Sequence, residues 1–151
     1  MQHTIDMTRT SRNTLLQFLE KYTLEELNTI PHQYNNNLIW NIAHIIVVQQ
    51  MLVYNLSGLP MMVSAEMVNK YKRGTKPEAE VTQEELDEIK TLLFATIDQT
   101  EKDFQNDIFK TYNEFTTMSG FTLRNAAEAA EFNNYHEGTH TGIMMSIRKF
   151  L

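Results

Sequence analysis

Residues 82–104 have the sequence TQEELDEIKTLLFATIDQTEKDF, which predicts one long amphipathic helix. Thr82 and Glu85 have the spacing of a capping box, which marks the start of a helix. Val81 and Leu86 have the spacing of the hydrophobic staple that often accompanies such a box. Apolar or small side chains then recur every three or four residues and form one stripe: Leu86, Ile89, Leu93, Ile97, Thr100 and Phe104. A stripe of this kind is buried against other helices.

Similar signals on both sides of this segment predict more helices and no paired strands. The other expected long helices cover residues 8–22, residues 36–58 and residues 122–151, with Asn36 or Asn37 and Thr122 as N-caps and Gly58 as the C-terminal stop. Short helical turns are expected from Thr23 and over residues 64–72, and an extended linker over residues 109–120. We therefore expect an all-α fold in which residues 1–151 form a single domain. Its architecture would be an up-down four-helix bundle with one long crossover connection between the second and third long helices.

The charge pattern argues against nucleic acid and membrane partners. The formal net charge is −6, and the most basic stretch, residues 70–76, is interpreted as a solvated turn. Residues 38–56 are apolar, but five Asn, His and Gln side chains interrupt them, which favours a buried core helix over a membrane span. Residues 1–11 lack the apolar core of a signal peptide. We expect a cytoplasmic protein.

Three histidines are candidate ligands for a divalent metal ion. The chain contains no cysteine, so any metal must be bound by imidazole, carboxylate or water. His136 and His140 are four residues apart and project from one face of a helix, although such pairs are also common at surfaces. His44 lies in an apolar stretch, where a buried imidazole needs a partner. It is either a neutral core histidine bonded to a carbonyl or to Asn41, or a third ligand.

The residues around the histidine pair allow two further hypotheses. His136–His140 has the His-Glu-x-x-His pattern of zinc peptidases, in which the glutamate acts as a base, but no downstream third ligand follows it. Glu137 is thus a candidate base, with a solvent-facing glutamate as the alternative. Gly138 and Gly142 lie on the opposite side of the helix from the histidines. They predict a close backbone contact there, either within the monomer or with a second subunit.

With these residues placed, the chain resembles the DinB/YfiT-like family of metalloenzymes. The resemblance rests on residues 37–44, NLIWNIAH, on residues 57–60, SGLP, and on residues 127–142, which end in YHEGTHTG. It implies a four-helix bundle, commonly dimeric, with nickel or zinc bound at the positions of His44, His136 and His140. Some members of the family are S-transferases or isomerases that use a low-molecular-weight thiol such as bacillithiol or mycothiol.

The first functional hypothesis is a metal-dependent enzyme that activates a thiol for transfer to a small-molecule substrate. Three imidazoles leave at least one coordination position for water or substrate, as in catalytic sites. Asn41 and Glu137 are then candidates to bind the outer nitrogens of the ligating histidines. The alternatives are a non-catalytic metal-binding protein and a metal-dependent hydrolase that uses Glu137.

Overall fold

Helices form most of the chain, and the only strands are two of two residues each. The computed structural model describes all of residues 1–151. The elements are α1 (Gln2–Lys21), α2 (Leu24–Asn28), α3 (Leu38–Gln50) with a π-helical extension (Met51–Asn55), α4 (Ala65–Tyr71), α5 (Gln83–Gln105), β1 (Phe115–Thr116), β2 (Thr122–Leu123), α6 (Ala126–Ile147) and a final 3₁₀ turn (Arg148–Phe150). The expected all-α class is confirmed.

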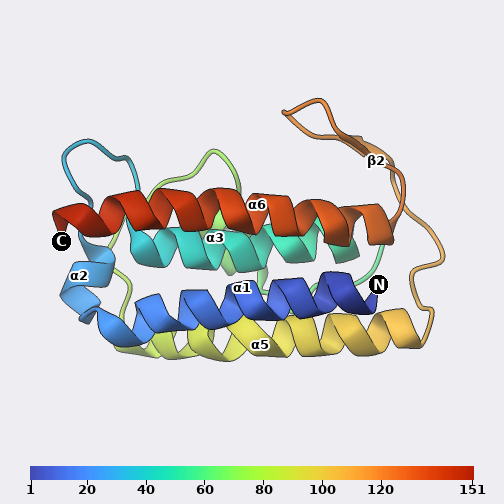
Figure 1. Ribbon diagram of the computed structural model, residues 1–151, viewed down its shortest axis with the longest axis horizontal. Coiled ribbons are helices and arrows are strands. Elements are labelled where there is room, and N and C mark those ends of the chain that lie inside the picture. Colours follow the sequence, from blue (N-terminus) through green and yellow to red (C-terminus); the bar gives the residue numbers. More distant parts are fainter.

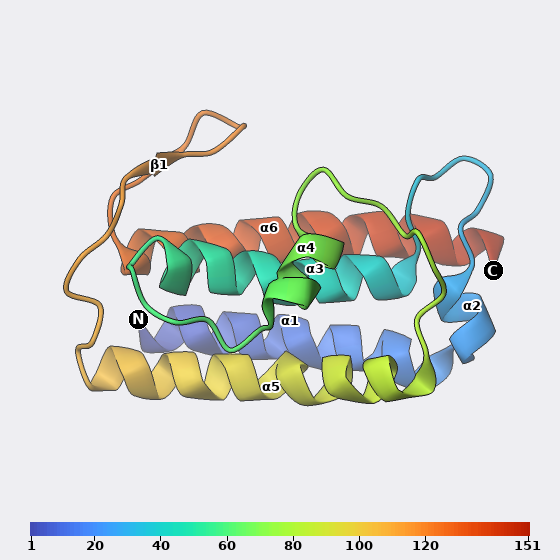
Figure 2. The same ribbon diagram turned by 180° about the vertical axis from the view of Figure 1, so that it is seen from behind.

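The four long helices α1, α3, α5 and α6 lie side by side (Figure 1). α1 packs against α5 and α6, and α3 packs against the same two helices. α1 and α6 run in one direction, and α3 and α5 run in the other (Figures 1 and 2). The connection over residues 56–82 allows α3 and α5 to be parallel, and it carries α4, which packs against α3.

Side-chain caps explain where most helices begin. Thr23 forms a complete capping box with Glu26, and Asn37 accepts a hydrogen bond from the Trp40 amide at 2.9 Å. Thr82 also accepts from the Glu85 amide, but the expected box is incomplete. The carboxylate of Glu85 instead binds residues of α4, because the crossover brings that helix within reach: its partners are Lys70 and Tyr71.

Two expected boundaries were wrong. α1 begins at Gln2 rather than near residue 8. α6 is capped by Asn125, whose side chain accepts from the Glu128 amide, and Thr122 lies in β2 instead. Cross-strand pairing outcompetes the local capping preference there, because Thr116 of β1 pairs with Thr122.

The segment expected as a linker includes the first strand of a small antiparallel hairpin. β1 and β2 pair with Phe115 opposite Leu123, and Gly120 occupies the turn with a φ of +81°. The hairpin projects from the end of the bundle near the start of α6 (Figure 1).

The core of the bundle is centred on α3. The segment Leu38–Asn55 is long and apolar enough to span a membrane, but 83% of it is buried within the protein. It is therefore the central helix of a packed core, as the polar interruptions predicted. Because α3 is enclosed on most sides, any polar side chain in its middle must find a partner inside the protein.

Candidate metal centre

His44 is held in the middle of α3 by contacts on two sides. Its side chain is almost fully buried, and its ring stacks on the indole of Trp40, one turn earlier, with centroids 4.7 Å apart and planes 12° apart. Nδ1 lies 2.6 Å from the carbonyl oxygen of Tyr71, at the end of α4. A carbonyl oxygen only accepts, so Nδ1 carries the proton and Nε2 keeps its lone pair.

The packing of α3 against α6 brings all three histidines together. The ring centroid of His44 lies 5.2 Å from that of His136 and 4.7 Å from that of His140. His136 and His140, one turn apart on α6, have centroids 4.6 Å apart. One nitrogen from each ring falls within 4.8 Å of the other two. Three nitrogens in this arrangement can bind one ion at about 2.0–2.1 Å once the side chains draw closer together around it.

Asn41 orients the imidazole of His140. Its Oδ1 lies 2.7 Å from Nδ1 of His140. The amide group of Asn41 donates in the other direction, to the carbonyl oxygen of Asn37 at 2.7 Å and to Oδ1 of Asn36 at 3.0 Å. These donations fix which end of the Asn41 amide faces His140. The imidazole is therefore protonated at Nδ1 and has Nε2 available, as in His44.

All three histidines are neutral near pH 7. Burial, aided by the neighbouring histidines and by Arg12, lowers the pKa of His136 to about 3. Burial and His44 lower the pKa of His140 to about 4, and burial also lowers the pKa of His44. Metal ligation requires neutral imidazole, so these rings are in the required state without loss of a proton.

His136 has a buried polar atom that no group of the protein satisfies. Its Nδ1 is buried and has no hydrogen-bond partner in the protein. A buried, unsatisfied imidazole nitrogen is costly, whereas a set of three imidazole ligands fits zinc, nickel, copper or iron. The donor set present therefore fits a divalent metal ion.

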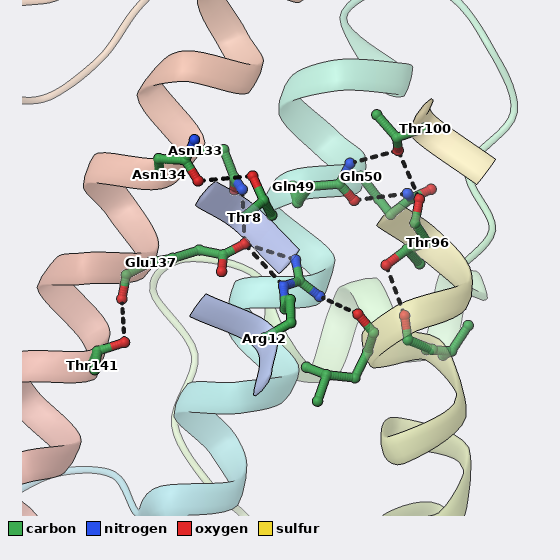
Figure 3. Close-up of polar contacts among 12 residues, drawn as sticks. Thr8, Arg12, Gln49, Gln50, Thr96, Thr100, Asn133, Asn134, Glu137 and Thr141 are labelled. Atoms are coloured by element: carbon green, nitrogen blue, oxygen red, sulfur yellow. Dashed lines mark hydrogen bonds and ion pairs between the residues drawn. The ribbon is translucent and has the colours of Figure 1, made fainter. Parts of the chain in front are cut away.

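Glu137 is buried. The solvent-facing glutamate that the sequence analysis gave as an alternative to a catalytic base was therefore wrong. Its side chain is fully buried and forms an ion pair with the equally buried Arg12 of α1, with Oε1 at 3.0 Å from Nε and 2.9 Å from Nη2. Asn133 donates to the same oxygen at 2.8 Å (Figure 3). Glu137 does not line the pocket that contains the histidines. Successive side chains of an α-helix point about 100° apart, so the side chain of Glu137 points toward α1 while that of the preceding residue, His136, faces the pocket.

Arg12 is the residue of this region that the sequence analysis missed. It lies on the buried face of α1, at helical spacing from Thr8, Leu15 and Leu19. A charged residue at a core position of an amphipathic stripe is a readable signal for a buried ion pair. The guanidinium also donates to the carbonyl oxygen of Leu93 in α5 at 3.2 Å, so it joins three of the four long helices (Figure 3).

Gly138 and Gly142 lie on the opposite side of α6 from the pocket, as expected, but make no close contact within the monomer. A Cβ atom at either position would meet nothing within 4 Å. Both glycines line a shallow groove that α1 shares with α6, beside Thr10 and Thr14. The hypothesis of close packing within the monomer was wrong.

The three histidines open onto a pocket of about 490 Å³. α3 and α6 form its floor, and the β1–β2 hairpin and the turn after α4 form other parts of its lining. A volume of this size suits a small organic molecule. The three histidines are therefore reachable by a small molecule rather than enclosed like a structural metal site.

Comparison with known protein families shows to which family the chain belongs. A profile of the DinB superfamily matches residues 7–144, which include the three histidines and all four long helices in whole or in large part. The comparison with curated proteins found no match. Since the family match covers most of the sequence and agrees with the helical fold, the chain belongs to the DinB superfamily.

Proposed function

We propose that His44, His136 and His140 bind one divalent metal ion and that the protein is a metal-dependent enzyme acting on a small molecule. The observation that carries the proposal is the convergence of three neutral imidazoles from two helices at the floor of a pocket. Zinc and nickel are the metals proposed, because neutral imidazole ligands suit both.

The residues of the chain would hold the ion with its open side toward the pocket. Tyr71 and Asn41 fix two of the imidazoles in the tautomer that leaves Nε2 available. When bound, the ion supplies a Lewis acid that favours the deprotonated form of a group reaching its open coordination position. The apolar lining of the pocket would exclude water from that group and strengthen its electrostatic interactions.

Within this class we propose a low-molecular-weight-thiol-dependent S-transferase. The chain has no cysteine, so a thiol nucleophile would have to be supplied by a second small molecule. A pocket of about 490 Å³ has space for part of a thiol and an apolar electrophile together. A purely metal-binding protein would need no pocket beside its ion. A hydrolase with Glu137 as the base receives no support, because that carboxylate is paired with Arg12.

We also propose a cytoplasmic homodimer. The groove lined by Gly138 and Gly142 is exposed and bordered by small side chains, so a second α6 could approach it closely. The absence of cysteine is compatible with a reducing compartment.

Metal content of the protein, purified without a histidine tag, tests the proposal. We expect about one zinc or nickel per chain by mass spectrometry, and nearly none after His44→Ala or His140→Ala. His32→Ala is the matched control, since His32 is exposed and outside the cluster. Equal metal content in all four proteins would refute the site.

The reaction is tested separately with an electrophile such as chlorodinitrobenzene and a panel of low-molecular-weight thiols. Absorbance measures consumption of the electrophile. We expect this consumption only when both metal and thiol are present. Tight metal binding without turnover for any thiol would favour the non-catalytic alternative.

A further inference from the structure

Arg73 is the only charged residue among those lining the histidine pocket. It follows α4 by two residues, in the turn to the long connection toward α5. It forms no ion pair or hydrogen bond with the rest of the protein, although acidic residues outnumber basic ones, 19 to 13. As expected from the sequence, residues 72–74 lie in a solvent-exposed turn, and Arg73 of this turn also borders the pocket.

The turn that carries Arg73 is fixed relative to the histidines. The carbonyl oxygen of Tyr71, two residues earlier, is the hydrogen-bond partner of His44. The hydroxyl of Thr75, two residues later, lies 2.8 Å from the carbonyl oxygens of both Lys70 and Lys72. Gly74, with a φ of +89°, allows the chain to reverse between them. Arg73 is thus held at the rim of the pocket by an ordered backbone.

The pocket has no negative charge to balance this cation. The lining includes no aspartate or glutamate, an imidazole carries no negative charge in either protonation state, and the nearby carboxylate of Glu137 is paired with Arg12. A divalent ion bound as proposed above would add two further positive charges. Arg73 is exposed to solvent, so its charge is hydrated in the free protein, and an anionic group bound beside it would meet no carboxylate of the lining that repels it. The rim of the pocket therefore favours a ligand with a negative charge over a neutral or a cationic one.

The walls of the pocket are mainly apolar. Trp40, Val48 and Leu52 of α3 and its extension form one side, and Phe132 of α6 and Phe115 of the hairpin contribute others. Such walls favour an apolar ligand body, because removal of apolar surface from water is favourable.

We propose that this pocket recognises a small amphipathic organic anion, with an apolar body against Trp40 and Phe132 and a carboxylate or similar group paired with Arg73. The inference rests on the proposed function insofar as the ligand occupies the same pocket as the reaction. It adds the chemical class of the substrate and a specificity residue that the metal site alone does not define.

The test compares octanoate with two probes of equal chain length, octanol and octylamine. Trp40 is the only tryptophan of the chain and lines the pocket, so its fluorescence reports binding directly. We expect octanoate to bind at least about fivefold more tightly than octanol, and octylamine to bind most weakly. Arg73→Gln should remove this preference without changing the affinity for octanol.

Lys72→Gln is the matched control. It removes the same charge at the adjacent residue, which is exposed, binds Asn69 and does not line the pocket. Equal affinities for octanoate and octanol, equal effects of the two substitutions, or no fluorescence response to any probe would overturn the proposal.

Each titration is carried out on both metal-loaded and chelator-treated protein, which separates the two proposals. If the preference for octanoate depends on Arg73 in the chelated protein but no metal binds, the metal proposal fails and the anion site stands. If metal binds normally but Arg73 has no effect on any probe, the anion site fails and the metal proposal stands.

Discussion

Nδ1 of His140 in α6 donates a hydrogen bond of 2.7 Å to Oδ1 of Asn41 in α3. This bond crosses the helix interface that forms the candidate metal centre. Asn41 is fully buried, and its amide nitrogen donates to the carbonyl oxygen of Asn37. It therefore holds the imidazole of His140 in a fixed position relative to α3. The same contact selects the tautomer and aligns the helices, so its loss should affect metal binding more than folding.

Asn41→Ala is expected to weaken zinc binding by roughly 10- to 100-fold, the usual effect of removing the acceptor behind a ligating histidine. Asn41→Asp keeps an acceptor at the same place but loses the two donations to Asn36 and Asn37, so it should retain more of the affinity than Asn41→Ala without reaching that of the wild type. Competition with a chromophoric chelator measures both. Equal losses in the two variants would show that Asn41 acts through packing or through its donations to Asn36 and Asn37 rather than through its hydrogen bond to His140.

Removal of either partner of the buried ion pair should destabilise the fold strongly. Arg12→Met leaves the Glu137 carboxylate buried without compensation, and such losses cost about 3–5 kcal/mol in the free energy of unfolding. Urea unfolding of Arg12→Met, Glu137→Gln and the double variant measures the coupling. We expect the double variant to be more stable than the sum of the two losses predicts.

Glu137→Gln also separates a structural role from a catalytic one. Since the carboxylate faces α1 and not the pocket, the folded fraction of this variant should bind zinc as the wild type does. A variant of unchanged stability that had lost hydrolytic activity would contradict the structural role and revive the hydrolase hypothesis.

Acid should destabilise the metal-free protein between about pH 7 and pH 5.5. Unfolded histidine has a pKa near 6.5, whereas folded His136 and His140 have pKa values of about 3 and about 4. The unfolded state therefore binds more protons in this window, and the free energy of unfolding falls as the pH falls. Urea midpoints in the presence of chelator measure this slope, and His140→Gln should make it shallower. An unchanged slope would show that folding does not lower the pKa of His140.

The features of the structure that the sequence predicted correctly are those with local sequence signals. Thr23 and Asn37 mark helix starts through contacts within a few residues, and the structure has both caps. His44 was detectable because a single imidazole interrupts an apolar helix, and His136 and His140 because their spacing matches one helical turn. The structure brings these three side chains together, as the sequence predicted.

Contacts that depend on the tertiary arrangement were not predictable in the same way. The partner of His44 is a backbone carbonyl of Tyr71, and every residue has a carbonyl, so the sequence carries no signal for it. Glu85 fitted a local capping box but binds Lys70 and Tyr71, because the crossover places α4 beside the start of α5. Arg12 is different: its position in a buried stripe was a usable signal that was not used.

Gly138→Ala and Gly142→Ala should each stabilise the monomer by about 1 kcal/mol, because both positions are helical and a Cβ atom there meets nothing within 4 Å. Gly58→Ala is the matched control. Its surroundings are equally open, but its φ of +71° is unfavourable for alanine, so that variant should lose stability. Urea unfolding at low protein concentration measures all three.

If a second subunit packs on the groove lined by Gly138 and Gly142, sedimentation will show weaker association of Gly138→Ala at high concentration, since the added methyl groups separate the helices. A loss of monomer stability at Gly138 would instead mean that the groove is filled within the chain.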